Sequence, residues 1–329
     1  MKSEFGIIKL FTILFLLSVA VHAQKGRKEF TPGKEWLDTE GQVINAHGAG
    51  FLFENGTYYW FGESRAERSS LGVAVYSSKD LYNWKNEGLA LNPVDGDDEH
   101  DIARGCVMER PKVIFNEKTG KYVMWFHLEM KGQGYNAARV AVAVADQVVG
   151  PYNFVTSYRP NGNMSRDMTV FVDDDGSAYH IYSSRDNYDL RIAKLSDDYL
   201  HHTAQDSLMF GEHREAPAII KHEGLYYLIT SGCTGWKPND ASIHVSESLF
   251  GNWKRKPSPL RGPHANITFD GQSTYILPVL GKKDAYIFIA DRWKPQDLRN
   301  SPYIWLPLEF DSGEPIVQWR DSWDLSMFD

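Results

Sequence analysis

GFLFENGTYYWFGES, at residues 50–64, predicts two apolar, aromatic-rich strands joined by a tight turn. Asn-Gly between two alternating apolar runs is a strong hairpin signal, because both residues tolerate the positive φ angles of a type I′ turn. Four later stretches repeat the pattern with turns of their own, at 112–129, 169–185, 218–232 and 273–293. The chain therefore contains one kind of β-hairpin five times.

A further apolar strand follows the earlier hairpins, as in GVAVYS at 72–77 and VAVAV at 140–144. Five units of three or four strands, roughly 50 residues apart, are typical of an all-β array such as a propeller. A β-sandwich is the alternative fold, but it does not ordinarily repeat one hairpin five times. No stretch of the chain has convincing helical periodicity. We therefore expect an all-β fold, a five-bladed β-propeller over residues 24–329, with no appended module.

Composition narrows the class of protein. The 329 residues include 10 Trp, 17 Tyr and 17 Phe, which is too aromatic for a chain that avoids packing. The net charge of −8 makes a nucleic acid an unsuitable partner. Two cysteines exclude a disulfide scaffold and a four-cysteine zinc site. Cys106 and Cys233 are the only pair that can form a disulfide, and we expect two free, buried thiols.

Residues 1–23 have the pattern of a secretory signal peptide. Lys2 and Lys9 precede an apolar run at 10–21, and Val21-His22-Ala23 supplies small residues for cleavage. An uncleaved anchor is the alternative, but the run is short for a membrane span. No later stretch approaches the length of a span, so we expect no membrane partner. The compact signal favours a bacterial host and a secreted or periplasmic protein.

Polar residues stand at the start of each repeated unit. In a propeller the innermost strands line the axis, so these residues are expected to meet at one mouth of the channel. Cleaving a glycosidic bond needs a carboxylic acid for the leaving oxygen and a second group that positions water or attacks. Crowded carboxylates raise one another's pKa, which keeps such an acid protonated. Metal ligation and blade-to-blade ion pairs are the alternatives. The five residues are His47, Glu109, Asp167, Glu215 and Gln272.

At these residues the chain resembles glycoside hydrolase family 43, whose fold is a five-bladed propeller. The matching blocks include ERPKVIFNEKTGKYVMW, SRDMTVFVDDDGSAYHIYSS and EAPAIIKHEGLYYLITSGCTGW, and they extend over most of 40–325. The resemblance implies an inverting hydrolase with Glu215 as general acid and Asp167 as the modulator of its pKa. The aspartate that the family places in its first blade is absent, because Asn45-Ala46-His47 stands there. This departure is similar to the branch of exo-β-1,3-galactanases, where Glu109 and Gln272 have counterparts at the site.

The resemblance to that branch implies an exo-acting enzyme that removes terminal β-linked galactose from plant arabinogalactan-type polysaccharide. An α-L-arabinofuranosidase or β-xylosidase is the alternative enzyme, and a sugar-binding propeller without catalysis is the alternative class. A glutamine amide is a weak base, but its carbonyl oxygen can hold a water. We therefore assign Gln272 as water holder and substitute for the base, through an imidic tautomer in that branch. Glu109 is assigned as a supporting carboxylate that binds sugar hydroxyls.

Further residues are candidates for sugar contacts. Trp236 is the best candidate for a stacking platform, and Tyr135 is a weaker one. Glu63 and Arg292 end strands in polar positions, where sugar hydroxyls or structural ion pairs are equally good partners. His47 is a candidate for orienting a water or, as a minority interpretation, for binding an axial Ca²⁺. One histidine without a clear shell of carboxylates is a weak calcium site, so we expect no cofactor and no metal.

Two polar runs are interpreted as surface features. DGDDEHD at 95–101 lacks the glycine-turn spacing of a calcium loop and predicts a solvated acidic loop. His201 and His202 are expected at the surface. The sequence does not define an oligomeric state.

Overall fold

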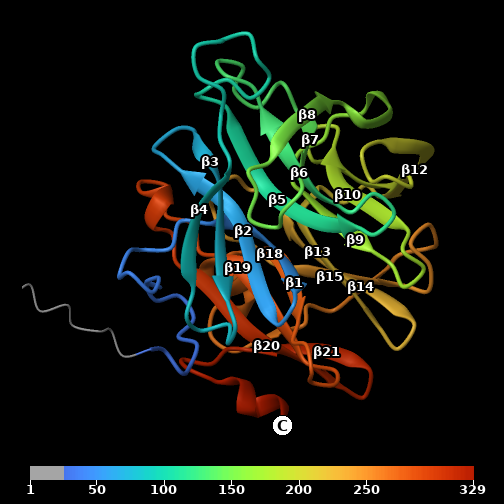
Figure 1. The fold of residues 1–329 in the computed structure, drawn as a ribbon. Helices are drawn as coiled ribbons and strands as arrows, with labels where there is room; N and C mark the ends of the chain where they lie inside the picture. The colour runs from blue at the N-terminus through green and yellow to red at the C-terminus, as the bar shows by residue number, and fades with distance from the viewer. Residues whose placement is uncertain (1–25) are drawn as a thin grey trace, which may run out of the picture.

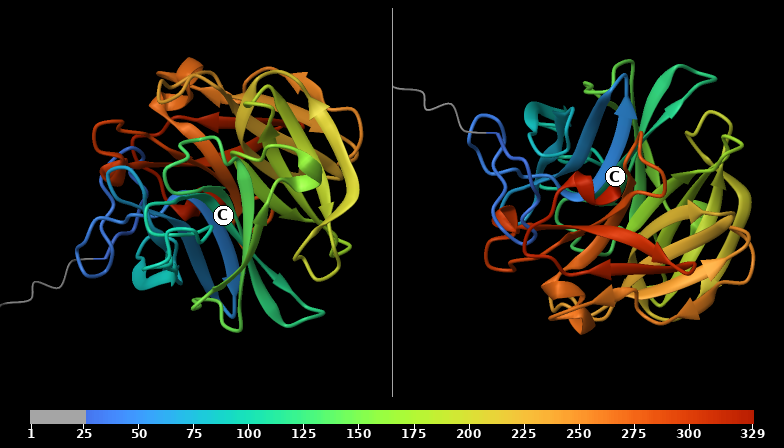
Figure 2. Two further views of the ribbon diagram at one scale, coloured as in Figure 1. Left: turned by 90° about the horizontal axis from the view of Figure 1, so that it is seen from above. Right: turned by 90° about the horizontal axis from the view of Figure 1, so that it is seen from below.

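Five sheets surround one axis in the computed structural model, which describes residues 26–329 (Figure 1). Contacts run from β1 (His47–Glu54) to β5 (Val107–Asn116), β9 (Met168–Val172), β13 (Arg214–His222) and β18 (Gln272–Pro278), and from β18 back to β1. These five strands are therefore the innermost of their blades, and the ring is closed. The views from above and below show the sheets spread around this centre (Figure 2). The predicted five-bladed propeller is confirmed, and the predicted signal peptide at 1–23 lies outside the described residues.

Each of the first four blades is a four-stranded antiparallel sheet. Blade 1 continues from β1 with β2 (Thr57–Arg65), β3 (Ser70–Ser78) and β4 (Lys85–Leu91), and blade 2 continues from β5 with β6 (Lys121–Glu129), β7 (Arg139–Ala145) and β8 (Asn153–Tyr158). Blade 3 continues from β9 with β10 (Ala178–Ser184), β11 (Asp189–Leu195) and β12 (His202–Phe210), and blade 4 continues from β13 with β14 (Leu225–Gly232), β15 (Ser242–Ser246) and β16 (Lys254–Lys256).

Blade 5 has one strand more than the repeat predicts. It contains β18, β19 (Tyr286–Asp291), β20 (Tyr303–Asp311) and β21 (Glu314–Gln318), and the short β17 (Leu260–Arg261) joins β21 in parallel. Helical structure in residues 26–329 is limited to four short 3₁₀ segments, η1 (Pro160–Gly162), η2 (Ala265–Asp270), η3 (Leu298–Asn300) and η4 (Leu325–Phe328). Among the described residues, no helix is both long and apolar enough to cross a membrane.

Apolar side chains fill the spaces between neighbouring blades. The alternation along each strand places one apolar face against the blade before and the other against the blade after. Separate buried clusters lie between blades 1 and 2, 2 and 3, and 3 and 4, and a larger cluster joins blades 4, 5 and 1. The sheets are thus held by side-chain packing, which fixes the innermost strands around the axis.

The two ends of the described chain close the ring between blades 5 and 1. The backbone of Phe30 exchanges hydrogen bonds with that of Trp323, at 2.7 and 3.1 Å. Trp305 packs against Trp36, Trp60 and other aromatic rings in the same place, and it is almost completely buried. Trp60 is also fully buried, so it serves blade packing.

Candidate active site

The polar residues at the unit starts sit at equivalent places in the five blades. His47 and Gln272 are the first residues of β1 and β18, Glu215 is the second of β13, and Glu109 is the third of β5. Asp167 directly precedes β9. The closed ring of innermost strands therefore brings all five backbone positions to one end of the axis.

β-Bulges interrupt three of these strands directly after the polar residue. The register shifts after His47, Glu109 and Glu215, where each strand leaves its regular pairing. The next residues, Gly48, Arg110 and Ala216, have φ angles of 64°, 55° and 56°. A bulge bends the strand and changes the direction of a side chain, and left-handed backbone at a non-glycine residue is strained. The polar side chains are thus aimed by local backbone that a regular strand does not provide.

The bulges of blades 1 and 2 interlock. A Cβ on Gly48 would lie 2.9 Å from the backbone nitrogen of Arg110, so close approach and positive φ both require glycine there. The buried ammonium of Lys112 donates to the carbonyl oxygens of Gly48, at 2.9 Å, and Arg110, at 3.3 Å. Lys112 therefore ties the two bulges together beneath the mouth of the channel.

A cavity of about 250 Å³ opens at this end of the axis. Four of the five polar residues line it, namely Glu109, Asp167, Glu215 and Gln272. Glu63, Tyr135 and Trp236 also contribute to its wall, as expected from the sequence. Other lining residues are Gly48, Arg110, His127, Arg166, Asn187, Cys233, Gly235 and Trp293. Residues far apart in the chain thus form one pocket.

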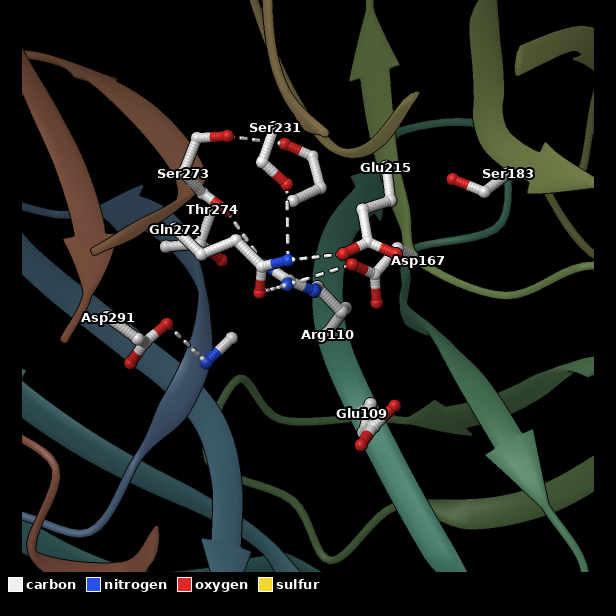
Figure 3. A network of polar contacts seen from close by, with 12 residues as sticks. Glu109, Arg110, Asp167, Ser183, Glu215, Ser231, Gln272, Ser273, Thr274 and Asp291 are labelled. Atoms are coloured by element: carbon white, nitrogen blue, oxygen red, sulfur yellow. Dashed lines mark hydrogen bonds and ion pairs between the residues drawn. The ribbon is translucent and has the colours of Figure 1, made fainter. Parts of the chain in front are cut away.

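Glu215 is a buried carboxyl beside another carboxylate. It is 7% exposed, and burial together with the negative charge of Asp167 raises its pKa to about 8. Asn187 donates to its Oε2 at 2.9 Å. Gln272 donates to its Oε1 at 2.8 Å (Figure 3). A carboxyl that stays protonated near neutral pH can give a proton to a leaving oxygen. Glu215 therefore has the properties of a general acid.

Arg110 contacts both Asp167 and Gln272, the two residues beside Glu215 in the cavity wall. Its Nη2 lies 2.9 Å from Oδ2 of Asp167 and donates to Oε1 of Gln272 at 2.6 Å (Figure 3). Its Nη1 donates to the carbonyl oxygen of Ser273 at 2.9 Å. The guanidinium is almost completely buried, so these contacts to blades 3 and 5 are not screened by water.

Glu109 is held in a separate charged network, away from Glu215 in Figure 3. Its Oε1 accepts from the hydroxyl of Tyr135 at 2.7 Å and from Arg65 at 3.2 Å, and its Oε2 lies 3.1 Å from Nδ1 of His127. Burial alone would raise the pKa of Glu109, but His127 and Arg65 hold that pKa well below its ordinary value. Glu109 is thus an ionised acceptor, suited to sugar hydroxyls.

Two residues of this network, together with Asp167, form a candidate group of metal ligands. Among residues 26–329, Glu109, His127 and Asp167 form the group whose ligand atoms lie within 4.8 Å of one another. Burial opposes a charge on His127, but contacts to Glu109 and Glu129 raise its pKa to about 9. A protonated imidazole has no lone pair for a metal. The donor set therefore fits a salt-bridge network better than a metal centre.

Two sequence candidates point elsewhere and correct the expectation for them. His47 is fully buried and is absent from the cavity lining, because its Nδ1 lies 3.2 Å from Asp291 and its Nε2 lies 3.1 Å from the carbonyl oxygen of Arg299. Arg292 donates to the carbonyl oxygen of Phe269 at 3.0 and 2.7 Å and stays outside the cavity. Both residues join parts of the structure rather than lining the cavity.

The structure also shows where three other features singled out in the sequence lie. Glu63 lies in the cavity wall, but it is 1% exposed and ion-paired with Arg65 at 2.6 Å. Cys106 and Cys233 are both free thiols, as expected, but Cys106 alone is buried and Cys233 is half-buried. The run at 95–101 lies at the surface, where its end residues Asp95 and Asp101 pair with arginines.

Sequence reasoning did not find several lining residues. Arg110 was visible only as the neighbour of Glu109, and Trp293 as the neighbour of Arg292. Trp293 donates from Nε1 to Oε1 of Gln272 at 2.9 Å, and its ring meets that of Trp236 edge to face, with centroids 5.5 Å apart. Nothing in the local pattern distinguishes which of two adjacent residues turns inward after a strand.

Comparison with known proteins identifies the family. The model of glycosyl hydrolases family 43 matches residues 51–301. The chain belongs to this family. The expected enzyme class, glycoside hydrolase, is thereby confirmed at the level of the family.

Solved structures of the family resemble the chain closely. One is a family 43 β-1,3-galactosidase in complex with galactodeoxynojirimycin, 50% identical with a TM-score of 0.87, and the match covers 90% of this chain and all of that one. Another is an exo-β-1,3-galactanase of Phanerochaete chrysosporium with β-1,3-galactotriose, 40% identical with a TM-score of 0.84, covering 90% of this chain and 68% of that one.

Curated relatives are more distant. A xylan 1,3-β-xylosidase of a Vibrio species is 21% identical over 64% of this chain. The chain spans 53% and 39% of the lengths of the two curated relatives that it matches.

Proposed function

We propose that the chain is an exo-acting, inverting β-galactosidase that releases terminal β-1,3-linked galactose from arabinogalactan-type chains of plants. The sugar is inferred from relatives, because the two solved structures at 50% and 40% identity are named for β-1,3-galactosidase and exo-β-1,3-galactanase activity. The two curated relatives named for xylosidase activity are each only 21% identical. Galactose is therefore preferred to xylose or arabinose.

The observation that carries a hydrolytic function is the environment of Glu215. Burial and Asp167 raise the pKa of this carboxyl to about 8, and it lines the cavity. A sugar-binding protein without catalysis gains nothing from a protonated carboxyl beside a carboxylate, since both cost free energy to bury. The pair supports proton transfer to a glycosidic oxygen.

The size of the cavity supports exo action. Its volume of about 250 Å³ is below the range of about 300–1,000 Å³ for pockets that take drug-sized ligands. A single terminal sugar suits this space better than an internal stretch of a polymer. Trp236, 42% exposed at the rim, offers a ring face on which an apolar sugar face can stack.

Residues 1–23 support export of the protein from a bacterial cell, because they carry the charge and apolar pattern of a signal peptide. N-terminal sequencing of protein secreted by a bacterial host tests this part of the proposal. A mature chain that starts at Gln24 is expected, and an intact Met1 in the membrane fraction would contradict it.

The substrate is tested with purified protein and three compounds, β-1,3-galactobiose, nitrophenyl arabinofuranoside and nitrophenyl xyloside. We expect galactose release from the first, with the α-anomer as the initial product by NMR. Glu215→Gln is the matched inactive control, since it keeps the shape and removes the proton donor. Release from the last two compounds alone would replace the substrate assignment. Binding without turnover on all three would favour a sugar-binding protein.

A further inference from the structure

A second cavity, of about 470 Å³, lies on the axis at the end away from the active site. The innermost strands begin at the active site, and this cavity is lined by residues further along them, from Phe51 on β1, Lys112 on β5 and Ile219 on β13. Its walls are mostly apolar and include the half-buried side chains of Leu52 and Phe171. The two cavities have no lining residue in common, so the far half of the channel is a separate, apolar space.

A buried cation lines this cavity at its inner end. Lys112 is 2% exposed and is the lining residue of β5 that is nearest to the active site. An ammonium has three N–H groups, and the acceptors here are the carbonyl oxygens of Gly48 at 2.9 Å and Arg110 at 3.3 Å. The neighbouring Arg110 has Asp167 at 2.9 Å, but Lys112 has no carboxylate partner among residues 26–329. The third N–H group is therefore available to a further acceptor.

The inner end of the cavity is suited to a negatively charged group. A buried cation without a counter-ion costs free energy. Burial and the positive charge of Arg110 lower the pKa of Lys112 well below its ordinary value, and Asp291 and Asp167 offset this only in part. An anion that pairs with the ammonium would remove this cost.

Two hydroxyl groups add donors to the lining at the same level. Thr169 and Tyr275 are the first lining residues of β9 and β18, as Lys112 is of β5. The hydroxyl of Tyr275 lies 3.5 Å from the carbonyl oxygen of Phe51, which is long for a hydrogen bond. This O–H group can therefore turn to a better acceptor. Hydrogen bonds of this kind are what a buried ion pair needs in addition to its charges.

The mouth of the cavity has the opposite character. Glu117 is acidic, and Lys221 is already paired with two aspartates, each at 2.8 Å. Phe115 and Val172, which also line the cavity, are each 37% exposed. A carboxylate gains nothing at this end, whereas an apolar chain finds apolar surface there.

We propose that this cavity binds an alkyl carboxylate, with its head group on Lys112 and its chain along the apolar walls toward Phe115. Strands rise by about 3.3 Å per residue, so the step from Lys112 to Phe115 covers about 10 Å. A chain of medium length, such as that of octanoate, reaches from the ammonium to the mouth. The site is separate from the catalytic cavity and does not depend on the proposed hydrolase function.

Chain length tests the apolar walls. We expect the Kd, measured by isothermal titration calorimetry on the wild-type protein, to fall about fourfold for each added methylene from butanoate through hexanoate to octanoate. Decanoate should gain less, because its last carbons pass the mouth. Equal affinity for all four compounds would overturn the proposal, since it would show a site for a small anion only.

The head group tests the role of Lys112. Octanoate should bind at least about tenfold more tightly than octanol, as for a hydrogen bond to a charged group, and octylammonium should not bind. Lys112→Met keeps the apolar stem and should reduce the affinity for octanoate to that for octanol. Lys221→Met is the matched control at the mouth and should keep the wild-type preference. Equal binding of octanoate and octylammonium, or a preference lost in Lys221→Met and kept in Lys112→Met, would overturn the proposal.

Leu52→Trp keeps the proposal testable if Lys112→Met fails to fold. The larger ring fills part of the cavity and should weaken the binding of octanoate by at least about tenfold, as for the loss of two buried methylenes. Leu89→Trp, at an exposed position of β4 outside the cavity, is the control and should bind octanoate like the wild type. Unchanged binding in a folded Leu52→Trp variant would place the ligand elsewhere and overturn the proposal. Each readout is a binding constant, so absence of galactosidase activity would leave this test intact.

Discussion

Nδ1 of His127 lies 3.1 Å from Oε2 of Glu109, and both residues line the cavity. The other ring nitrogen, Nε2, lies 2.8 Å from Glu129, so one imidazole faces two carboxylates. His127 and Glu129 are each 1% exposed. The charge of Glu109 is therefore stabilised by a buried cation, which in turn depends on a second carboxylate.

His127→Gln is expected to lower the free energy of unfolding by about 3–5 kcal/mol at pH 6, because it leaves the buried Glu129 without a cation and Glu109 with Arg65 alone. The folded pKa of about 9 is above the ordinary 6.5, so this stabilisation is complete below pH 6.5 and is lost as the pH rises through 9. Urea unfolding of wild type should show that decline, and the variant should not. His201→Gln, at an exposed position in blade 3, is the control. Parallel pH curves for wild type and His127→Gln would contradict a charged His127.

We expect the pair of Asp167 and Glu215 to set the alkaline limit of activity. With the pKa of Glu215 at about 8, kcat/KM should fall above that pH as the acid loses its proton. Asp167→Asn removes a negative charge and should move this limb down by about one pH unit. Asp175→Asn, in an exposed turn of the same blade, should leave it in place. An alkaline limb that does not move in Asp167→Asn would show that the charge of Asp167 does not raise the pKa of Glu215.

The fold was predictable because its information is local. Each hairpin has alternating apolar residues and its own turn, as at Asn55 and Gly56, whose φ angles of 49° and 77° suit a tight turn. Five such units have few ways to bury both faces other than in a closed ring. The short β17 was not predicted, since two residues carry no periodic signal.

The pocket was predictable only as far as the backbone repeats. Equivalent positions at the strand starts brought Glu109, Asp167, Glu215 and Gln272 together. His47 occupies the equivalent position in blade 1, yet its ring turns to Asp291, a partner 244 residues away. Side-chain direction depends on bulges and on distant partners, and neither leaves a mark in the local sequence.

Trp236 and Arg292 give opposite predictions for substrate binding. Trp236→Ala is expected to raise KM for galactobiose by about 2- to 10-fold, as for one aromatic stacking contact, with a smaller change in kcat. Arg292→Ala should lower the melting temperature, because its guanidinium holds the carbonyl oxygen of Phe269. KM should stay within about twofold of wild type in this variant. Steady-state kinetics and thermal melts on both variants check the pair, and an equal rise in KM would place Arg292 at the sugar after all.

His202 is half-buried and lies against the fully buried His180, so the expectation of a surface position was wrong for it. Its Nε2 lies 3.0 Å from Nδ1 of His180, and its Nδ1 lies 2.8 Å from the hydroxyl of Tyr158. Burial lowers the pKa of His202 to about 4, against a weaker opposite effect of Asp206, and it lowers the pKa of His180 as well.

Acid should therefore destabilise blade 3 through these histidines. Between pH 6.5 and 4 the unfolded chain binds protons that folded His202 does not, so stability falls as the pH falls, by about 2 kcal/mol for one such group. His202→Gln should be less stable than wild type at pH 7, because a hydrogen bond is lost, but its stability should decline less toward pH 4.5. Urea unfolding at pH 4.5, 5.5, 6.5 and 7.5 measures this difference. His201→Gln should follow wild type, and a His202→Gln curve with the wild-type slope would show that the pair already accepts a proton when folded.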